Sequence, residues 1–119
     1  MWRGLVLVGP LGAAGCVPAP TPYPQSITGP DPVQRVRGII RAGETNDAQV
    51  VPLLVDRLED EDEAVRFYAI LSLEKIVGTR HGYHYGANEP QRRQAVQRWR
   101  DYVAGSGRSG AAPPVAAPN

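Results

Sequence analysis

The sequence predicts an all-α protein: a short α-solenoid of about two helical hairpins, that is four helices, with disordered termini. Apolar residues recur at intervals of three and four through the middle of the chain, which is the period of an amphipathic helix. Aspartate or asparagine precedes most of these segments and glycine follows several of them, as expected at helix starts and stops. Proline and glycine cluster at the two ends, where the apolar residues are too few to offset the entropy of ordering.

These observations divide the chain into four parts. Residues 1–15 are predicted to be a signal peptide and residues 16–30 a proline-rich linker. Residues 31–104 hold the predicted helices, and residues 105–119 are predicted to form a disordered tail. A domain of this size buries only about 60% of the surface that its unfolded chain exposes, so its stability should be marginal.

The first predicted helix starts at Asp31, which is a suitable N-cap, with Pro32 at the first helical position and Gln34 completing a capping box. We expect it to stop at Gly43. One of its faces carries Val33, Val36 and Ile40. The second predicted helix covers residues 47–59, and Pro52 is tolerated there because it lies near the first turn. Its apolar stripe consists of Val51, Leu54, Val55 and Leu58.

The third predicted helix begins in an acidic run, whose charges suit the positive end of a helix dipole, and ends at Gly78. Apolar residues lie on more than one of its faces, which predicts a central helix packed on both sides. The fourth begins at Asn88 and carries a single apolar stripe, with arginines pointing away from it: Ala95, Val96, Trp99, Tyr102 and Val103. We expect this helix to close the end of the array, with Trp99 buried.

A faint internal repeat supports a solenoid. The segment VRGIIRAG at Val36 aligns with VRFYAILS at Val65, an offset of 29 residues. Repeats of 20 to 50 residues, each built from two helices, are typical of α-solenoids.

The segment VVPLLVDRLEDEDEAVRFYAILSLEKIVG, residues 50–78, resembles the HEAT-repeat family, in particular the short HEAT-like repeats of bilin-lyase-type proteins. A Pro-Leu-Leu helix leads through an acidic turn to Ala64-Val65-Arg66, as in that family. The resemblance implies that Arg66 braces the turn between the two helices. It also implies that four apolar residues belong to the core: Val65, Ala69, Leu73 and Ile76. The long loop before the fourth helix departs from the tight turns of the family.

That loop holds the only two histidines, in RHGYHYGANEPQRR, residues 80–93. His81 and His84 are too few for a zinc site, which takes three or four protein ligands. No serine or cysteine in the sequence has the neighbours that would activate it as a nucleophile. We therefore predict no catalytic, metal-binding or cofactor-binding residue, and we expect Tyr83 and Tyr85 to make this loop a packed connector.

The start of the chain, MWRGLVLVGPLGAAGC, combines an arginine, an apolar stretch and small residues before the only cysteine, Cys16. This is the plan of a secretory signal. The residues before Cys16 resemble the lipobox of bacterial lipoproteins, although that family usually has leucine where Ala13 stands. The resemblance implies lipidation of Cys16 and a location in the cell envelope, membrane-anchored, periplasmic or secreted. The alternatives are an ordinary secretory signal and an apolar start on a cytosolic protein.

The predicted function is therefore a non-catalytic protein-interaction or scaffold module at the cell envelope, with an unknown protein partner and a membrane anchor at Cys16. Two alternatives belong to other classes. One is a HEAT-like lyase or modifying enzyme, and the other is a cytosolic solenoid that binds nucleic acid through the arginines of the last helix. A net charge of +1 and the neighbouring acidic run argue against nucleic acid.

Overall fold

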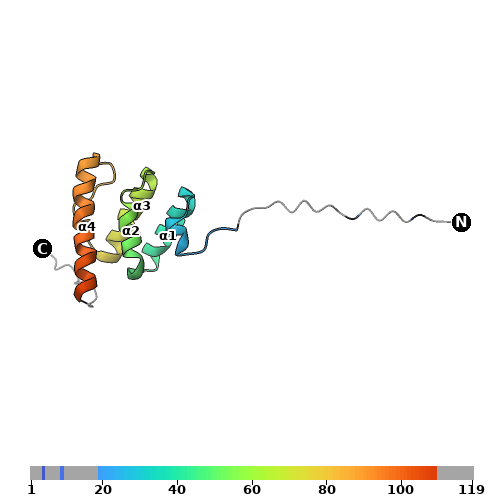
Figure 1. Cartoon of the computed structure of the whole chain (residues 1–119), viewed down its shortest axis with the longest axis horizontal. Helices are drawn as coiled ribbons and strands as arrows, with labels where there is room; N and C mark the ends of the chain where they lie inside the picture. Colours follow the sequence, from blue (N-terminus) through green and yellow to red (C-terminus); the bar gives the residue numbers. More distant parts are fainter. Residues whose placement is uncertain (1–3, 5–8, 10–18, 110–119) are drawn as a thin grey trace.

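The computed structural model of the chain describes Gly4, Gly9 and residues 19–109, and in this part it is helical without any strand (Figure 1). The elements are the 3-10 helix η1 (Gln25–Thr28), α1 (Pro32–Glu44), the 3-10 helix η2 (Ala48–Val50), α2 (Val51–Arg57), α3 (Glu63–Val77) and α4 (Glu89–Ser109). The predicted fold class, all-α with four α-helices, is confirmed. Apart from Gly4 and Gly9, the predicted signal peptide lies outside the described residues, as do Cys16 and the part of the predicted tail from residue 110 onward.

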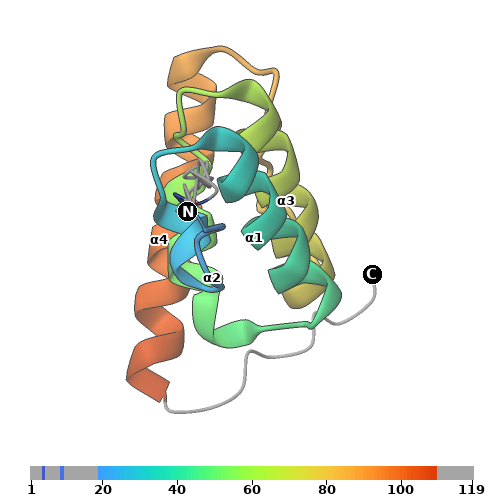
Figure 2. The same ribbon diagram turned by 90° about the vertical axis from the view of Figure 1, so that its right-hand side faces the viewer.

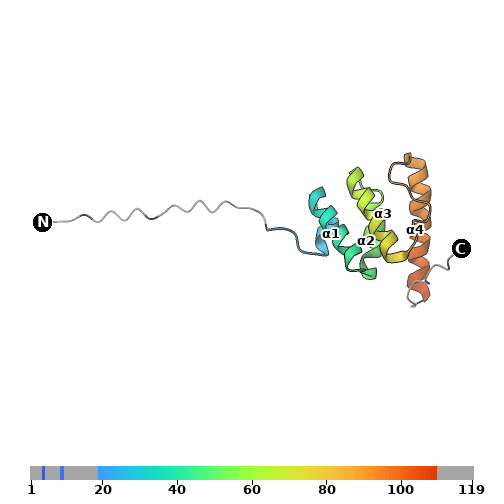
Figure 3. The same ribbon diagram turned by 180° about the vertical axis from the view of Figure 1, so that it is seen from behind.

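The helices form two layers around one apolar core. α1 packs along α3 in one layer. In the other layer α2 packs on α3 and lies between η1 and α4, and η1 also packs on α1. Figure 2, seen from the N-terminal end, shows α1 and α3 on one side of the domain and α2 and α4 on the other. Figure 3 shows the helices following one another from α1 to α4. The fully buried large side chains are Ile27, Ile39, Leu54, Leu58, Val65, Ile70, Leu73, Val96 and Trp99.

The starts and stops of α3 follow from local chemistry. The carboxylate of Asp62 accepts hydrogen bonds from the backbone N–H groups of Ala64 and Val65, at 2.9 and 3.2 Å, and thereby caps the helix. Gly78 ends it with a φ of 90°, a left-handed conformation that favours glycine. Buried side chains lie around much of the helix, since it contacts both α1 and α2. The prediction that this helix is the central one is confirmed.

α1 differs from its prediction in its end and in its buried face. Gly43 is not a helix stop but lies inside α1, where a Cβ would come within 2.7 Å of the Ser72 hydroxyl. The missing side chain lets α1 approach α3 closely, and the Ser72 hydroxyl donates to the carbonyl of Ile39 at 2.8 Å. Val33, which the sequence places on the apolar face, is 55% exposed, because the buried face of α1 turns toward η1 and α3. That face carries Ile39 and Ala42.

The folded part begins before residue 31. Ile27, in η1, is wholly buried, and the hydroxyl of Tyr23 donates to the carboxylate of Asp47 at 2.5 Å. The sequence places Ile27 and Tyr23 in a proline-rich linker, and for these residues that prediction is wrong. A single isoleucine among prolines carries no periodic signal, so its burial depends on tertiary packing against α1.

The repeat unit is 31 residues long, not 29. Asp31 and Asp62 cap α1 and α3, and four residues after each cap stands an arginine. Nη1 of Arg35 donates to the two carbonyl oxygens just before its capping aspartate, at 2.9 and 3.0 Å. Nη1 of Arg66 donates to the two equivalent oxygens of its own turn, at 2.8 and 3.2 Å. An offset of 29 aligns identical residues, but it pairs the exposed Arg37 with Arg66, whose side chain bonds to its own turn. The structural equivalent of Arg66 is Arg35.

α4 closes the end of the array and runs opposite to α2. Arg100 pairs with Glu59, just beyond the end of α2, at 2.8 Å. Further along α4, Val103 and Gly107 lie beside Val51, at the start of α2. Because helices within one layer of a regular array run in the same direction, α4 does not continue the repeat. The loop of residues 78–88 brings the chain to the start of α4 (Figure 1), which extends to residue 109, past the predicted end of the domain at 104.

Candidate protein-interaction groove

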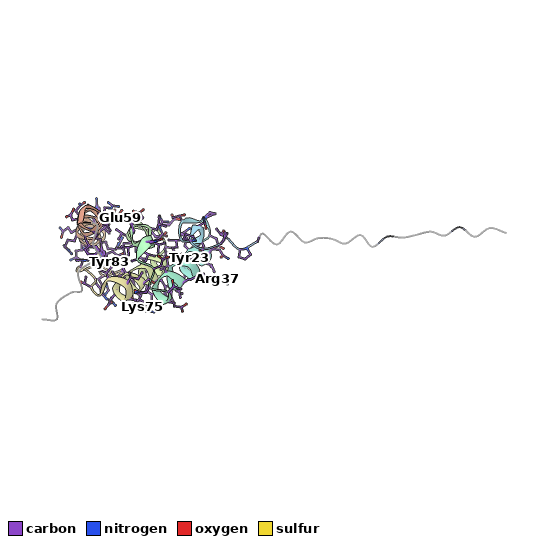
Figure 4. The ribbon with its side chains drawn as sticks, turned by 90° about the horizontal axis from the view of Figure 1, so that it is seen from below. Tyr23, Arg37, Glu59, Lys75 and Tyr83 are labelled. Atoms are coloured by element: carbon purple, nitrogen blue, oxygen red, sulfur yellow. The ribbon has the colours of Figure 1, made fainter. Side chains whose placement is uncertain are left out.

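The loop of residues 78–88 is packed between α2 and α4. The indole Nε1 of Trp99 donates to the carbonyl of Arg80 at 2.9 Å, which joins α4 to the start of the loop. The hydroxyl of Tyr83 donates to the carbonyl of Leu58 at 2.6 Å, which joins the loop to the end of α2. Tyr83 is almost wholly buried, and burial raises its pKa to about 12. Figure 4 shows Tyr83 towards the α4 end of the domain and Tyr23 nearer the α1 end.

The two histidines of the loop face different neighbours. The ring of His81 lies edge-on to Trp99, with centroids 4.5 Å apart, and its centroid is 5.1 Å from that of Tyr102. Its Nε2 is buried and has no hydrogen-bond partner, and burial lowers the pKa of His81. His84 is exposed and stacks on Tyr85 at 5.2 Å. The described residues contain no group of three or more histidines, cysteines or carboxylates placed to hold a metal ion.

A buried ion pair joins the two repeats. Nε of Arg35 lies 3.1 Å from Oδ2 of Asp60, and both side chains are more than nine-tenths buried. Arg57 lies 3.4 Å from the same carboxylate, and the backbone N–H of Asp62 donates to its other oxygen at 3.0 Å. Asp60 therefore holds the turn of one repeat against the helix of the previous one, which is a structural role.

An apolar groove lies where the last turns of α4 pass the start of α2 and the end of α3; we call it the α4 groove. Its volume is about 290 Å³. One wall comes from η2 and α2, with Ala48, Gln49, Val51 and Pro52, and from the end of α3, with Ile76 and Val77. The other wall comes from α4, with Tyr102, Val103, Ser106 and Gly107. None of these residues is charged, so the groove offers apolar surface rather than ionic or catalytic groups.

The structure separates the predicted core residues into two groups. Val65, Ala69, Leu73 and Trp99 have no exposed surface and form the core. Ile76 is only partly buried, because it is the penultimate residue of α3 and lines the α4 groove. The sequence does not reveal this groove: Tyr102 and Val103 lie on the same apolar stripe as Trp99, and only the place where α4 passes α2 distinguishes them.

Comparison with known proteins agrees with the repeat geometry. The family described as HEAT repeats matches residues 23–98. The match begins at Tyr23, where the folded part also begins. No curated protein and no solved structure matched the chain. Since the family match covers well over half of the chain and its two-layer helical packing is present, the chain belongs to the HEAT-repeat family.

Proposed function

We propose that the protein is a non-catalytic interaction module of the cell envelope, exported and lipid-anchored at Cys16, and that it holds its partner in the α4 groove. HEAT repeats are a family suited to protein interaction and scaffolding. The observation that carries the proposal is the α4 groove itself, an uncharged, apolar surface on the helix that closes the array. Such a surface favours an apolar segment of another protein.

The interior contacts of the domain support a non-catalytic role. The groups most suited to acid-base chemistry are engaged in holding the fold together: Asp60 pairs with Arg35, and His81 packs against Trp99. The pKa of Tyr83 is raised by burial, with its hydroxyl bound to a backbone carbonyl, so it too serves the fold.

The anchor is supported by the start of the sequence, where small residues precede the only cysteine. Only six residues lie between Cys16 and Tyr23, where the folded part begins, so the two are at most ~25 Å apart when the chain is extended. An anchored domain would therefore stay close to the lipid surface, with its α1 end nearest to the anchor and α4 at the opposite end (Figure 1).

The anchor is tested by expressing the chain and its Cys16→Ser variant in a bacterial host supplied with an alkyne-bearing fatty acid. We expect only the parent protein to carry the label and to be found in the membrane fraction. Equal fractionation of the two chains, with no label on either, would rule out the anchor.

The groove is tested by placing a photo-crosslinking amino acid at Val103, in the groove, or at Gln97, on the exposed face of the same helix. We expect one discrete crosslinked product in the envelope fraction from position 103 and none from position 97. Identical products from both positions, or none from 103, would contradict the use of the groove.

A further inference from the structure

The outer side of the layer formed by α1 and α3 carries apolar side chains that remain in contact with solvent. Each helix contributes one stripe with intervals of three and four residues, so the side chains of a stripe are neighbours on one side of their helix. The stripes consist of Val33, Val36 and Ile40 on α1 and Ala64, Phe67 and Leu71 on α3. Val33 and Ala64 are exposed and the other four are partly buried. Among the described side chains that pack against the core, only Val36 belongs to these stripes. We call this surface the α1–α3 face; it lies on the side of the domain away from α2 and α4 (Figure 2).

The two stripes occupy equivalent positions in the two repeats. Each residue of the α1 stripe stands 31 residues before its counterpart in the α3 stripe, which is also the offset between the capping aspartates. The same offset relates two exposed residues of opposite charge that continue the stripes, Glu44 on α1 and Lys75 on α3. Figure 4 shows Lys75 on the side of the domain opposite to Glu59, as expected for the outer side of this layer.

α1 and α3 run in the same direction and in register. Asp60, two residues before the cap of α3, pairs with Arg35 near the start of α1. Further along, the hydroxyl of Ser72 donates to the carbonyl of Ile39, and it would also meet a Cβ at Gly43. Ser72 therefore lies level with residue 41, its equivalent in the first repeat. Equivalent residues of the two stripes are consequently level with each other.

This arrangement makes the α1–α3 face complementary to itself. A two-fold axis that runs parallel to the helices, midway between them, places α1 of each copy over α3 of the other and keeps the level of every residue. Each apolar residue of one stripe then faces the apolar stripe of the second copy. Glu44 of each copy faces Lys75 of the other, which gives two ion pairs related by the axis.

The charges at the edges of the face agree with the same arrangement. Arg37 is exposed beside the α1 stripe, and Glu63 is exposed beside Phe67. The axis brings the outer edge of α1 over the outer edge of α3, and so brings Arg37 of one copy toward Glu63 and the Phe67 ring of the other. The guanidinium of Arg41 lies 5.2 Å from the centre of the Tyr23 ring, which holds this second arginine away from the face.

We propose that the protein forms a two-fold dimer through the α1–α3 face, with each α1 packed on α3 of a second copy. Association removes the two stripes of each copy from water, which is the driving force, while the charged residues at their ends and edges select the two-fold orientation. Because α2 and α4 belong to the other layer, the dimer presents two α4 grooves. The inference depends neither on the anchor nor on use of the groove.

The test is the mass of the full chain carrying Cys16→Ser, measured by sedimentation equilibrium from micromolar to millimolar concentration. We expect twice the mass of one chain. Phe67→Asp, which places a carboxylate in the face, should give the mass of a single chain. Pro52→Asp is the matched control, because it places the same charge at an exposed position of the α4 groove, and it should keep the dimer. The mass of a single chain for the parent at every concentration, or a dimer that Phe67→Asp leaves intact, would overturn the proposal.

Exchange of the end charges tests the orientation. Glu44→Lys and Lys75→Glu each create two like-charge contacts in the dimer, and each should weaken association by ~10-fold or more. The chain with both changes regains opposite charges across the axis and should associate like the parent. A double variant that associates no better than the single variants would refute the two-fold arrangement.

A photo-crosslinking amino acid at Ile40 identifies what covers the face in the bacterial host. We expect a product of twice the chain mass. A product with a different envelope protein, and none between two copies, would show that the face serves another partner and would overturn the dimer. Crosslinking from Val103 reports on the α4 groove alone, so failure of the dimer and failure of the proposed function are distinguishable.

Discussion

Truncation of Trp99 is the sharpest test of how α4 closes the array. The side chain has no exposed surface, packs edge-on against His81 and donates through Nε1 to the carbonyl of Arg80. Trp99→Ala removes these contacts together and leaves a cavity between α4 and the loop. The change should therefore loosen α4, the loop and the α4 groove at once, because the three share this contact.

The expected decrease in the free energy of unfolding has two parts, the lost packing of the side chain and the lost hydrogen bond. Replacing a buried tryptophan by alanine costs ~3–5 kcal/mol, and the lost hydrogen bond adds about 1 kcal/mol, so we expect a loss of ~4–6 kcal/mol. This is a large part of the ~5–15 kcal/mol that stabilises a typical domain. Trp99→Phe keeps most of the ring but removes the donor, and we expect it to cost only ~1–2 kcal/mol.

The assay is urea unfolding followed by far-UV circular dichroism, because fluorescence would also report the second tryptophan, Trp2. Gln97→Ala, on the exposed face of α4, is the matched control and should shift the midpoint very little. A midpoint for Trp99→Ala that coincides with that of Gln97→Ala would refute the reasoning. Trp99 would then not hold α4 in place.

Two further predictions concern the buried charges and the loop. Asp60→Ala leaves Arg35 buried without its counter-ion and should lower the free energy of unfolding by ~3–5 kcal/mol in the same assay. Glu61→Ala, at an exposed neighbouring position, should lower it only slightly. Equal effects of the two changes would show that the ion pair is not needed for stability. The pKa of His81 is lower in the folded state than in the unfolded chain, so as the pH falls the unfolded chain takes up a proton before the folded protein does. The contribution of neutral His81 to the free energy of unfolding should therefore be complete above about pH 6.5 and decrease as the pH falls toward the folded pKa. His81→Asn should flatten this part of the pH profile and His84→Asn should not; an unchanged slope in His81→Asn would contradict the assignment.

Features encoded within a few residues are well predicted from the sequence. Asp31 caps α1, the acidic run starts α3 and Gly78 ends α3, as predicted, because each of these features depends only on its own turn. Trp99 is buried, because a strong apolar stripe on a long helix must face the core.

Features that depend on distant contacts are not predicted. Gly43 looks like a helix stop but serves close packing against Ser72, which only the neighbouring helix reveals. Ile27 looks like part of a linker because its partner, α1, lies later in the chain. The α4 groove depends on the direction in which α4 passes α2, and the sequence of a crossover loop does not encode that direction in any simple pattern.

The reversed direction of α4 determines where the array of repeats can be extended. A further hairpin added after Ser109 would meet a helix that runs in the opposite direction, and it could not repeat the contacts that α3 makes with α1 and that α2 makes with η1. A duplicated 31-residue unit inserted before α2 would instead carry its own capping aspartate and the arginine that bonds to its turn. Its helices would have helices of the same direction on each side. Gene duplication or engineered extension can thus lengthen this array only upstream of the loop at residues 78–88, and the groove beside α4 would move outward unchanged with every added unit.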